Sequence, residues 1–414
     1  MGRLNLPEIT ARSAELDKCV NCGLCQAVCP TYLEDGHEGR TARGKIILLK
    51  GMLEGRIEPS SSIADLADDC LTCYACQTVC PAGVKTELLW TAMRQDLAPL
   101  STTTKRKHRA LNWTVGSPKI MKNLVKRFGR VEGFDRNSPS SARLTRYGLP
   151  LFKGAPYLDQ LNEIYPAVGN EVGRVGLLLG CSANLSAPWA VDSAITLLRQ
   201  CGWTVVVPKE QGCCGAPAIN NGHWRLAKRL ARHNLNLFDN LDLQAITSPD
   251  ATCISAMGHD YPNMFADEDA AEFSVDRMAE KSTDLSKLVG KALDEGRIRF
   301  NPFKAVITVH DSCHATHFGH GNRWRDLLKA IPGIEIREMA ESTLCCGFGG
   351  SYSVMHRESS DKIAARKMKN VYETGAEIVL VGSPGCQIRL QTSPKVDNAP
   401  QVRMALELVA GMAM

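Results

Sequence analysis

The sequence predicts an α+β protein of several domains, and three observations lead to this prediction. The chain has 414 residues, which is enough for more than one hydrophobic core. Its first 81 residues contain two copies of one cysteine run, separated by segments with helical periodicity. Its second half contains a longer repeat, in which short apolar runs alternate with helical segments. We therefore expect a helical, cysteine-rich N-terminal domain followed by two pseudo-symmetric α/β domains.

The two N-terminal runs share the spacing Cys-x2-Cys-x2-Cys-x3-Cys-Pro, and each cysteine of the first recurs 51 residues later. This spacing is typical of two [4Fe–4S] clusters in which the fourth cysteine of each run ligates the other cluster. Zinc and disulfides are the alternatives, but zinc sites rarely use two such runs ending in Cys-Pro. One expected ligand set is Cys19, Cys22, Cys25 and Cys80. The other expected set is Cys70, Cys73, Cys76 and Cys29.

Helical patterns separate and follow these runs. Residues 43–53 are amphipathic, Ser60 is a candidate N-cap for a short helix that ends near Asp69, and residues 86–97 again have helical periodicity. We therefore expect residues 1–100 to form one cluster domain. Its helical spacers make it similar to the α-helical ferredoxin domain of respiratory dehydrogenases rather than to the compact, β-rich ferredoxin.

Residues 101–170 match no repeat, and we expect a linker with some helix. Residues 101–147 hold twelve Lys or Arg against two acids, in a chain of net charge +5. This basic stretch fits a docking surface for an acidic partner subunit or an anionic membrane face, and equally a solvated linker helix. No nucleic-acid-binding motif accompanies the charge, so we expect no nucleic-acid partner.

A second internal repeat begins near residue 172. Its apolar runs are residues 175–180, 245–247, 305–309 and 378–381. Its helical patterns are residues 190–201, 223–239, 322–331 and 359–374. This alternation predicts βαβ units with parallel sheets, whose carboxyl strand ends bind ligands in open α/β proteins. We expect one domain at residues 171–290 and another at residues 303–414, with their cysteines gathered near one cleft.

Each half of this repeat carries four cysteines at matching positions. The two sets are Cys181, Cys213, Cys214 and Cys253, and Cys313, Cys345, Cys346 and Cys386. Adjacent cysteines do not readily pair with one another in a disulfide. Either set could therefore hold a third iron–sulfur cluster or zinc, and a structural relic without metal is the alternative. Cys201 stands outside the pattern, and we expect it to be a buried thiol.

Four histidines surround the first cysteine of the second half: His310, His314, His317 and His320. Imidazole can replace thiolate at iron, as in Rieske centres. We favour a role in helix capping or hydrogen bonding, with His310 and His317 as the best candidates for a functional role. The run Phe348-Gly349-Gly350 lacks the spacing of a dinucleotide-binding loop and predicts a tight turn that lets backbone approach a cluster.

Each half reads Cys-x31-Cys-Cys-Gly-x37 or x38-Cys, which resembles the CCG domain. This domain occurs twice in heterodisulfide reductases and in iron–sulfur subunits of several flavin-linked dehydrogenases. The family pattern ends in CxxC, whereas this chain has Ala256 and Arg389 at the last position. The order of two cluster runs and two CCG halves resembles the glycolate oxidase iron–sulfur subunit. The matching stretches include Cys29-Pro-Thr-Tyr32, Arg43-Gly-Lys45, Leu344-Cys-Cys-Gly347, Gly350-Ser-Tyr352, Lys367-Met-Lys-Asn370 and Gly385-Cys-Gln387.

This resemblance implies an electron-transfer subunit without catalytic residues of its own for the substrate. It implies FAD-binding glycolate oxidase subunits that oxidise glycolate to glyoxylate, and a quinone or another acceptor for the electrons. The chain itself has no flavin or nicotinamide fingerprint. A hydride carries two electrons and a cluster passes one, so we expect a flavin upstream, on partner subunits only.

Several alternatives share parts of this layout. They are the iron–sulfur subunit of an anaerobic glycerol-3-phosphate dehydrogenase, that of a D-lactate dehydrogenase, a disulfide-cleaving enzyme of the heterodisulfide reductase type, and a metal-dependent interaction module. The sequence shows no secretory signal and no apolar stretch of about 18 residues. Together with 17 cysteines, this predicts a cytoplasmic location, with peripheral contact to the cytoplasmic face of the inner membrane as an option.

Overall fold

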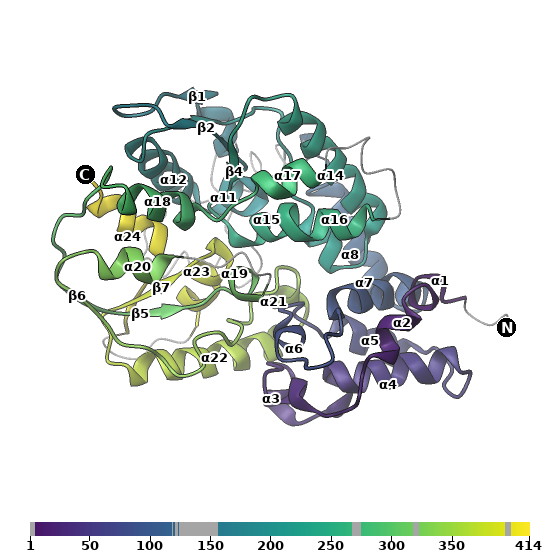
Figure 1. Cartoon of the computed structure of the whole chain (residues 1–414). Coiled ribbons are helices and arrows are strands. Elements are labelled where there is room, and N and C mark those ends of the chain that lie inside the picture. Colours follow the sequence, from purple (N-terminus) through teal and green to yellow (C-terminus); the bar gives the residue numbers. More distant parts are fainter. Residues whose placement is uncertain are drawn as a thin grey trace.

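The computed structural model describes residues 5–117, 119–120, 123, 156–266, 275–317, 323–393 and 399–414. Figure 1 shows a helical N-terminal part that lies beside two α/β halves. The predicted α+β class is confirmed. Among the described residues, no helix combines the length and the apolar character needed to cross a lipid bilayer.

The N-terminal part is built from short helices around an apolar core. Its α-helices are α1 (Pro7–Thr10), α2 (Ser13–Asp17), α3 (Tyr32–Asp35), α4 (Ala42–Leu53), α5 (Ser61–Asp68), α6 (Ala75–Thr78) and α7 (Thr86–Leu97). The three predicted helices correspond to α4, α5 and α7. The Oγ of Ser60 accepts a hydrogen bond from the Ile63 amide and caps α5 as expected. Leu49, Leu89 and Met93 are fully buried between these helices.

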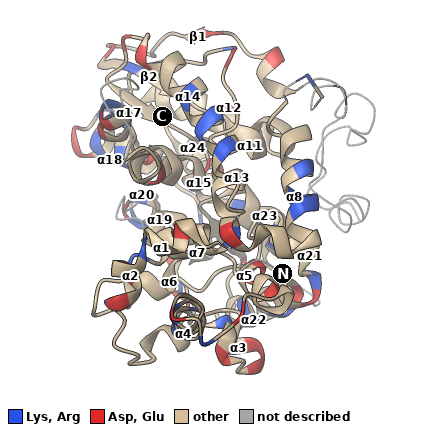
Figure 2. Cartoon of the chain, turned by 90° about the vertical axis from the view of Figure 1, so that its right-hand side faces the viewer, with Lys and Arg blue, Asp and Glu red and all other residues tan. Residues whose placement is uncertain are grey.

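Helix α8 (Thr102–Trp113) follows in the basic stretch and is anchored to the N-terminal part. Its Lys107 forms a buried ion pair with Asp68 at 3.3 Å. Lys105, Arg106 and Arg109 stay exposed, and Figure 2 shows Lys and Arg on α8. Most of the predicted linker beyond α8, residues 124–155, lies outside the described residues.

The first half contains a four-stranded sheet in the order β1-β3-β2-β4. Its strands are β1 (Ile164–Tyr165), β2 (Gly173–Leu177), β3 (Trp203–Val206) and β4 (Ala245–Thr247). Only β1 runs antiparallel, and it precedes the expected domain start at residue 171. The helices of this half are α11 (Gly180–Ser186), α12 (Pro188–Gln200), α13 (Ala216–Asn220), α14 (Trp224–Asp239), α15 (Ala251–Ser255), α16 (Tyr261–Met264) and α17 (Val275–Lys281).

The second half contains a parallel sheet in the order β6-β5-β7-β8. Its strands are β5 (Ala305–His310), β6 (Ile334–Ile336), β7 (Ile378–Val381) and β8 (Gln401–Met404). The helices from α18 onward are α18 (Leu285–Asp294), α19 (Cys313–His317), α20 (Trp324–Lys329), α21 (Tyr352–Met355), α22 (Arg357–Glu373), α23 (Pro384–Gln391) and α24 (Ala405–Met412). The central strands β3-β2-β4 match β6-β5-β7, so the internal repeat of the sequence is a structural repeat.

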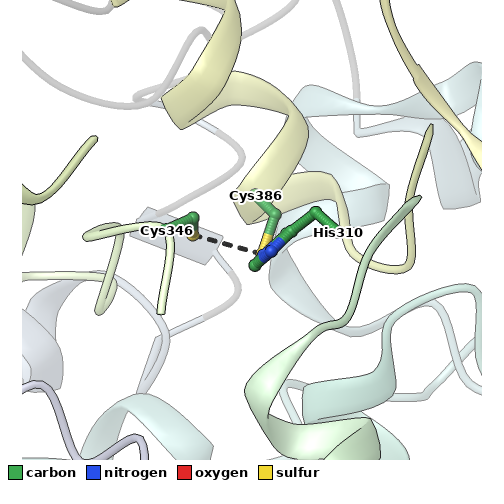
Figure 3. A group of neighbouring side chains, drawn as sticks. All are labelled: His310, Cys346 and Cys386. Carbon is green, nitrogen blue, oxygen red and sulfur yellow. Dashed lines mark hydrogen bonds between the residues drawn. The ribbon is translucent and has the colours of Figure 1, made fainter. Parts of the chain in front are cut away.

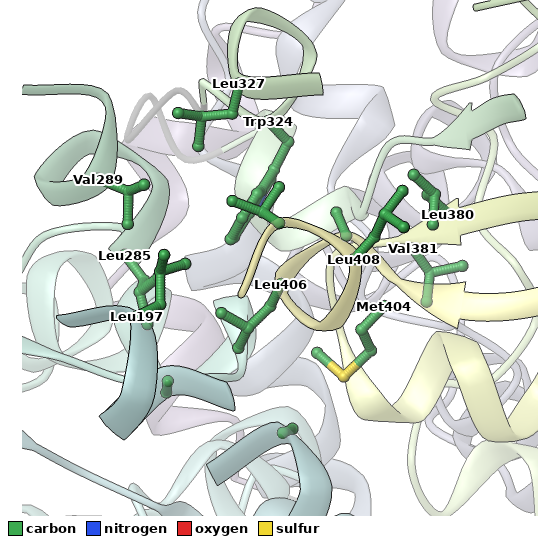
Figure 4. Close-up of a cluster of buried hydrophobic side chains, with 14 of the residues drawn as sticks. Leu197, Leu285, Val289, Trp324, Leu327, Leu380, Val381, Met404, Leu406 and Leu408 are labelled. Atoms are coloured by element: carbon green, nitrogen blue, oxygen red, sulfur yellow. The ribbon is translucent and has the colours of Figure 1, made fainter. Parts of the chain in front are cut away.

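The two halves share one hydrophobic core. Helix α24 from the C-terminus packs against α12 of the first half. Figure 4 shows Leu197 of α12, Leu285 and Val289 of α18, and Leu406 and Leu408 of α24 in this common cluster. Because apolar side chains from both halves fill the same interior, the two sheets are held in a fixed relation.

Candidate metal centres

The first cysteine loop surrounds a small cavity near the surface. The cysteines that line it are Cys19, Cys22, Cys25, Cys76 and Cys80. All four members of the first expected ligand set therefore meet here, including Cys80 from the other run. Cys22 is exposed, and its neighbours Val20 and Leu24 are 67% and 54% exposed.

The second cysteine loop surrounds a small adjoining cavity. The cysteines that line it are Cys29, Cys70, Cys73 and Cys76. Cys29 of the first run therefore joins the three local cysteines of the second, and Cys76 borders both cavities. Neither cavity has a carboxylate among its described lining residues. A donor set of thiols without hard oxygen ligands fits an iron–sulfur cluster.

Both loops use the same backbone geometry. Asn21 and Thr72 occupy matching positions and have φ of 58° and 50°. Gly23 and Tyr74 also match, with φ of 83° and 60°. Left-handed backbone is costly for a β-branched residue such as Thr72, and such strain persists where the surroundings enforce it. Its recurrence at matching positions of both runs indicates that the loop shape serves the cavity.

A buried cation lies beside the second cavity. The side chain of Lys45 is almost fully buried, and its Nζ donates a hydrogen bond to the carbonyl oxygen of Arg40. Burial raises the pKa of Cys29, and the nearby Lys45 ammonium opposes that rise. Burial also raises the pKa of Cys76. A buried ammonium at this place stabilises the negative charge that thiolates bring to an iron–sulfur site.

The N-terminal part docks on both halves through the second loop. The thiol of Cys73 contacts that of Cys345, and this contact and burial raise the pKa of Cys73. Arg94 of α7 is buried and donates from Nη2 to the carbonyl oxygen of Cys70 at 2.6 Å. The same guanidinium also donates to the carbonyl oxygen of Asn220 in the first half. The second cavity therefore lies where all three parts of the molecule meet.

The first half brings its four predicted cysteines together. Cys213 contacts Cys181 and Cys214, and Cys214 in turn contacts Cys253. Gly180 precedes Cys181 with φ of 65°, and a Cβ there would lie 2.6 Å from the Cys253 sulfur. Only glycine therefore leaves room for this thiol. Cys201 is buried in the apolar core, where burial raises its pKa to about 12.

The second half gathers its own set in the same way. Cys345 contacts Cys313 and Cys346, and the sulfurs of Cys346 and Cys386 are 3.2 Å apart. Figure 3 shows these last two side chains with His310, which comes from the end of β5. The contacts of Cys346 with Cys345, Cys386 and His310 lower its pKa well below the ordinary value.

Of the histidines in the second half, one forms a hydrogen bond with the N-terminal part and two lie beside cysteine thiols. His317 shares a hydrogen bond of 2.7 Å with Thr78 of the N-terminal part, which agrees with the expected hydrogen-bonding role. His314 Nδ1 lies 3.4 Å from the sulfur of Cys313, and burial lowers its pKa. His310 lies against the thiols. His320 falls outside the described residues.

The buried charged residues near the cysteines include three cations that were not predicted as functional. They are Lys45, Arg94 and Lys367. Lys45 and Lys367 lie in stretches that carry the family resemblance, but nothing in their sequence context predicts that a lysine is buried. Arg94 lies on a helix with ordinary periodicity, and its role depends on the docking of separate parts.

Comparison with known protein families gives two matches. The 4Fe-4S dicluster domain matches residues 15–84, which include both cysteine loops. The cysteine-rich domain known as CCG matches twice, at residues 175–258 and 307–391. These matches agree with the two cavities of the N-terminal part and with the two thiol sets of the α/β halves.

Similar proteins share this arrangement. The chain is 30% identical over 400 residues to a probable glycolate oxidase iron–sulfur subunit of Bacillus subtilis, covering 91% of this chain and 88% of that protein. It is 28% identical over 424 residues to a subunit of the dihydromethanophenazine:CoB–CoM heterodisulfide reductase of Methanosarcina mazei, covering 96% and 93%. It is 30% identical over 218 residues to lactate utilization protein A of Halalkalibacterium halodurans, covering 52% and 88%. The chain therefore belongs to the family of iron–sulfur oxidoreductase subunits that includes the glycolate oxidase iron–sulfur subunit.

Proposed function

We propose that this chain relays electrons in a flavin-dependent dehydrogenase complex that oxidises glycolate to glyoxylate. FAD-binding subunits take the hydride from the substrate, and a quinone or another acceptor receives the electrons. Two [4Fe–4S] clusters supply one-electron transfer when bound. Cys19, Cys22, Cys25 and Cys80 would hold one of them. Cys70, Cys73, Cys76 and Cys29 would hold the other.

The observation that carries this proposal is the sharing of eight cysteines between two adjoining cavities with Cys76 on their common wall. The two cysteine loops differ in their exposure to solvent, and this difference supports an order of electron-transfer steps. The first loop presents Cys22 and the apolar side chains of Val20 and Leu24 to solvent. A partner's redox group can approach closely at such an apolar, exposed loop. The second loop is covered by the α/β halves and suits an internal step.

Glycolate is the first candidate for the substrate of the complex. The relative whose name includes glycolate oxidase matches almost the whole chain. The relative named for lactate utilization aligns with about half of this chain, so lactate is the second candidate. A disulfide-cleaving activity is less well supported. Ala256 and Arg389 occupy the positions of the last CCG cysteines, and Arg389 is paired with Asp361 at 2.6 Å.

The proposed location is the cytoplasm, with peripheral contact to the cytoplasmic face of the inner membrane as an option. The exposed basic residues of α8 and the 70% exposed side chain of Trp113 fit peripheral contact with an anionic bilayer.

The test is a comparison of the isolated chain with the complex that contains the FAD-binding subunits. We expect glycolate-dependent dye reduction by the complex and none by the chain alone. D-lactate and glycerol 3-phosphate serve as competing substrates. Dye reduction by the isolated chain would contradict the relay, and a complex that prefers D-lactate would contradict glycolate as the substrate.

A further inference from the structure

The two α/β halves differ at one position beside their thiols. His310 stands three residues before Cys313, whereas Leu178 stands three residues before Cys181. Both side chains are buried, with 1% and 0% exposure. The second half therefore directs an imidazole toward its cysteines at the position where the first half has an aliphatic group.

The imidazole of His310 and two thiols form a compact donor set. One ring nitrogen of His310 and the sulfurs of Cys346 and Cys386 all lie within 4.8 Å of one another (Figure 3). His310 ends β5, Cys386 lies on α23 directly after β7, and Cys346 lies in the loop after β6. Three neighbouring strands thus bring one ligand each to the edge of the sheet where α/β proteins bind ligands.

The Nδ1 atom of the His310 imidazole forms a hydrogen bond with the backbone. His310 Nδ1 lies 3.2 Å from the carbonyl oxygen of Ser342, so the proton resides on Nδ1. Nε2 is buried and has no hydrogen-bond partner among the described residues. Metal-binding histidines commonly donate one N–H to a carbonyl in this way, which fixes the ring and leaves the other nitrogen free to ligate.

The carbonyl oxygen of Ser342 also binds a buried cation, Lys367. Lys367 is fully buried, and its Nζ donates to the carbonyl oxygen of Ser342 at 3.2 Å and to that of Glu341. The Ser342 carbonyl thus orients both His310 and Lys367. The ammonium supplies positive charge beside thiolates, which a site with two or more ionised cysteines requires.

We propose that the second half binds one tetrahedral divalent metal ion of the zinc type through His310, Cys346 and Cys386. Two thiolates and an imidazole are a donor set that zinc prefers, and the absence of redox chemistry at zinc makes the site structural. Cys313 and Cys345 are the remaining thiols of the set that can complete four-coordination. The first half has Leu178 in place of the imidazole and lacks this donor set.

The consequence concerns the neighbouring cluster loop. Cys345 is adjacent to the ligand Cys346 and contacts Cys73 of the second N-terminal loop. An ion held by Cys346 would fix this loop and, through it, the docking of the N-terminal part. This inference does not depend on the substrate or on the direction of electron flow, because it concerns only residues of the second half.

The test measures zinc and iron in the full chain, purified without oxygen and then supplied with Zn²⁺. We expect about one zinc per chain beside about eight irons. His310→Leu, which copies the first half, should lower the zinc affinity by at least about tenfold. His310→Cys should retain the ion, and Co²⁺ substitution should show a spectrum with one more thiolate. Cys214→Ser, the first-half counterpart of a change at Cys346, should leave the zinc content unchanged.

The iron content and the EPR signals of the N-terminal clusters serve as the folding control for each variant. Zinc loss in His310→Leu with intact clusters supports the site. Absence of zinc with about twelve irons per chain would overturn it, because a third cluster would then occupy the thiols. Undiminished zinc affinity in His310→Leu would remove the histidine from the ligand set, and zinc loss in Cys214→Ser would place the ion in the other half.

Discussion

The hydroxyl group of Tyr352 in the second half donates a hydrogen bond of 2.9 Å to Oδ1 of Asp69, the residue directly before Cys70. Both residues are buried. The other carboxylate oxygen of Asp69 pairs with Arg40 at 2.7 Å. The start of the second cluster loop is therefore held from two sides, by its own domain and by the second half.

Replacing this tyrosine should weaken the docking of the N-terminal part. Tyr352→Phe removes a buried hydrogen bond to a charged group and should lower the free energy of unfolding by about 1.5–3 kcal/mol. Chemical denaturation, followed by the visible absorbance of the clusters, measures this loss. Tyr157→Phe removes an exposed hydrogen bond to Asp192 and is the matched control, expected to change stability much less. Equal losses in both variants would contradict the special role of the Tyr352 contact.

Substitution of the fourth cysteine of a run should damage the cluster that is held by the other run. Cys29 lies in the cavity of the second loop, and Cys80 lies in that of the first. In Cys29→Ser we expect loss or alteration of the cluster on Cys70, Cys73 and Cys76, and in Cys80→Ser the reverse. EPR of the reduced protein should show that the signal retained in one variant is the signal lost in the other. Loss of the same signal in both would contradict the crossed ligand sets.

Removal of the buried charge of Lys45 should lower the reduction potential of the second cluster. An ammonium close to the cluster favours the reduced, more negative state by about 2 kcal/mol at an effective dielectric constant of about 20. This corresponds to roughly 80 mV for one electron. Lys45→Met keeps most of the aliphatic volume, and an EPR-monitored redox titration measures the shift.

The control for the Lys45→Met titration is Lys50→Met, which removes a more exposed charge from the same helix. Its effect should be small because solvent screens the charge. The signal that moves in Lys45→Met should be the one that Cys29→Ser removes. A shift of the other signal would show that Lys45 acts on the first cluster and would contradict this prediction.

The contact between α8 and the first half should weaken in acid. The rings of His108 and His223 stack at 4.4 Å, and Asn112 donates a hydrogen bond to Nε2 of His223 at 2.9 Å. Burial, with His108, Arg229 and Arg225 nearby, lowers the pKa of His223 to about 4. Below its ordinary pKa of 6.5 the unfolded chain therefore binds a proton that the folded chain does not. This contribution to stability is complete above pH 6.5 and is lost as the pH falls toward 4.

Hydrogen exchange of the α8 amides between pH 7 and about 5, corrected for intrinsic rates, measures this effect. His223→Gln can still accept from Asn112 but cannot become charged, so protection of α8 should then depend less on pH. An unchanged pH dependence in this variant would assign the effect to another group.

Much of the local structure could be predicted because it depends on residues that are close in sequence. The cap at Ser60, the helices α4 and α7, and the strands β2, β4, β5 and β7 follow from polar caps and apolar periodicity. Strands β6 and β8 were not predicted, since Glu335 and Arg403 interrupt their apolar pattern. Strand β1 was not predicted either, because a two-residue strand is defined only by its pairing with β3.

The sequence alone determined which atoms are available for iron: eight thiols at a spacing that short loops can wrap around a cluster. The tertiary structure decided which groups surround them. It buried Lys45 and Lys367, placed Arg94 and Tyr352 across the domain contacts, and turned His310 toward two thiols. These relations join residues tens to hundreds of positions apart. They arise from packing within and between the domains, which no local pattern of residues encodes.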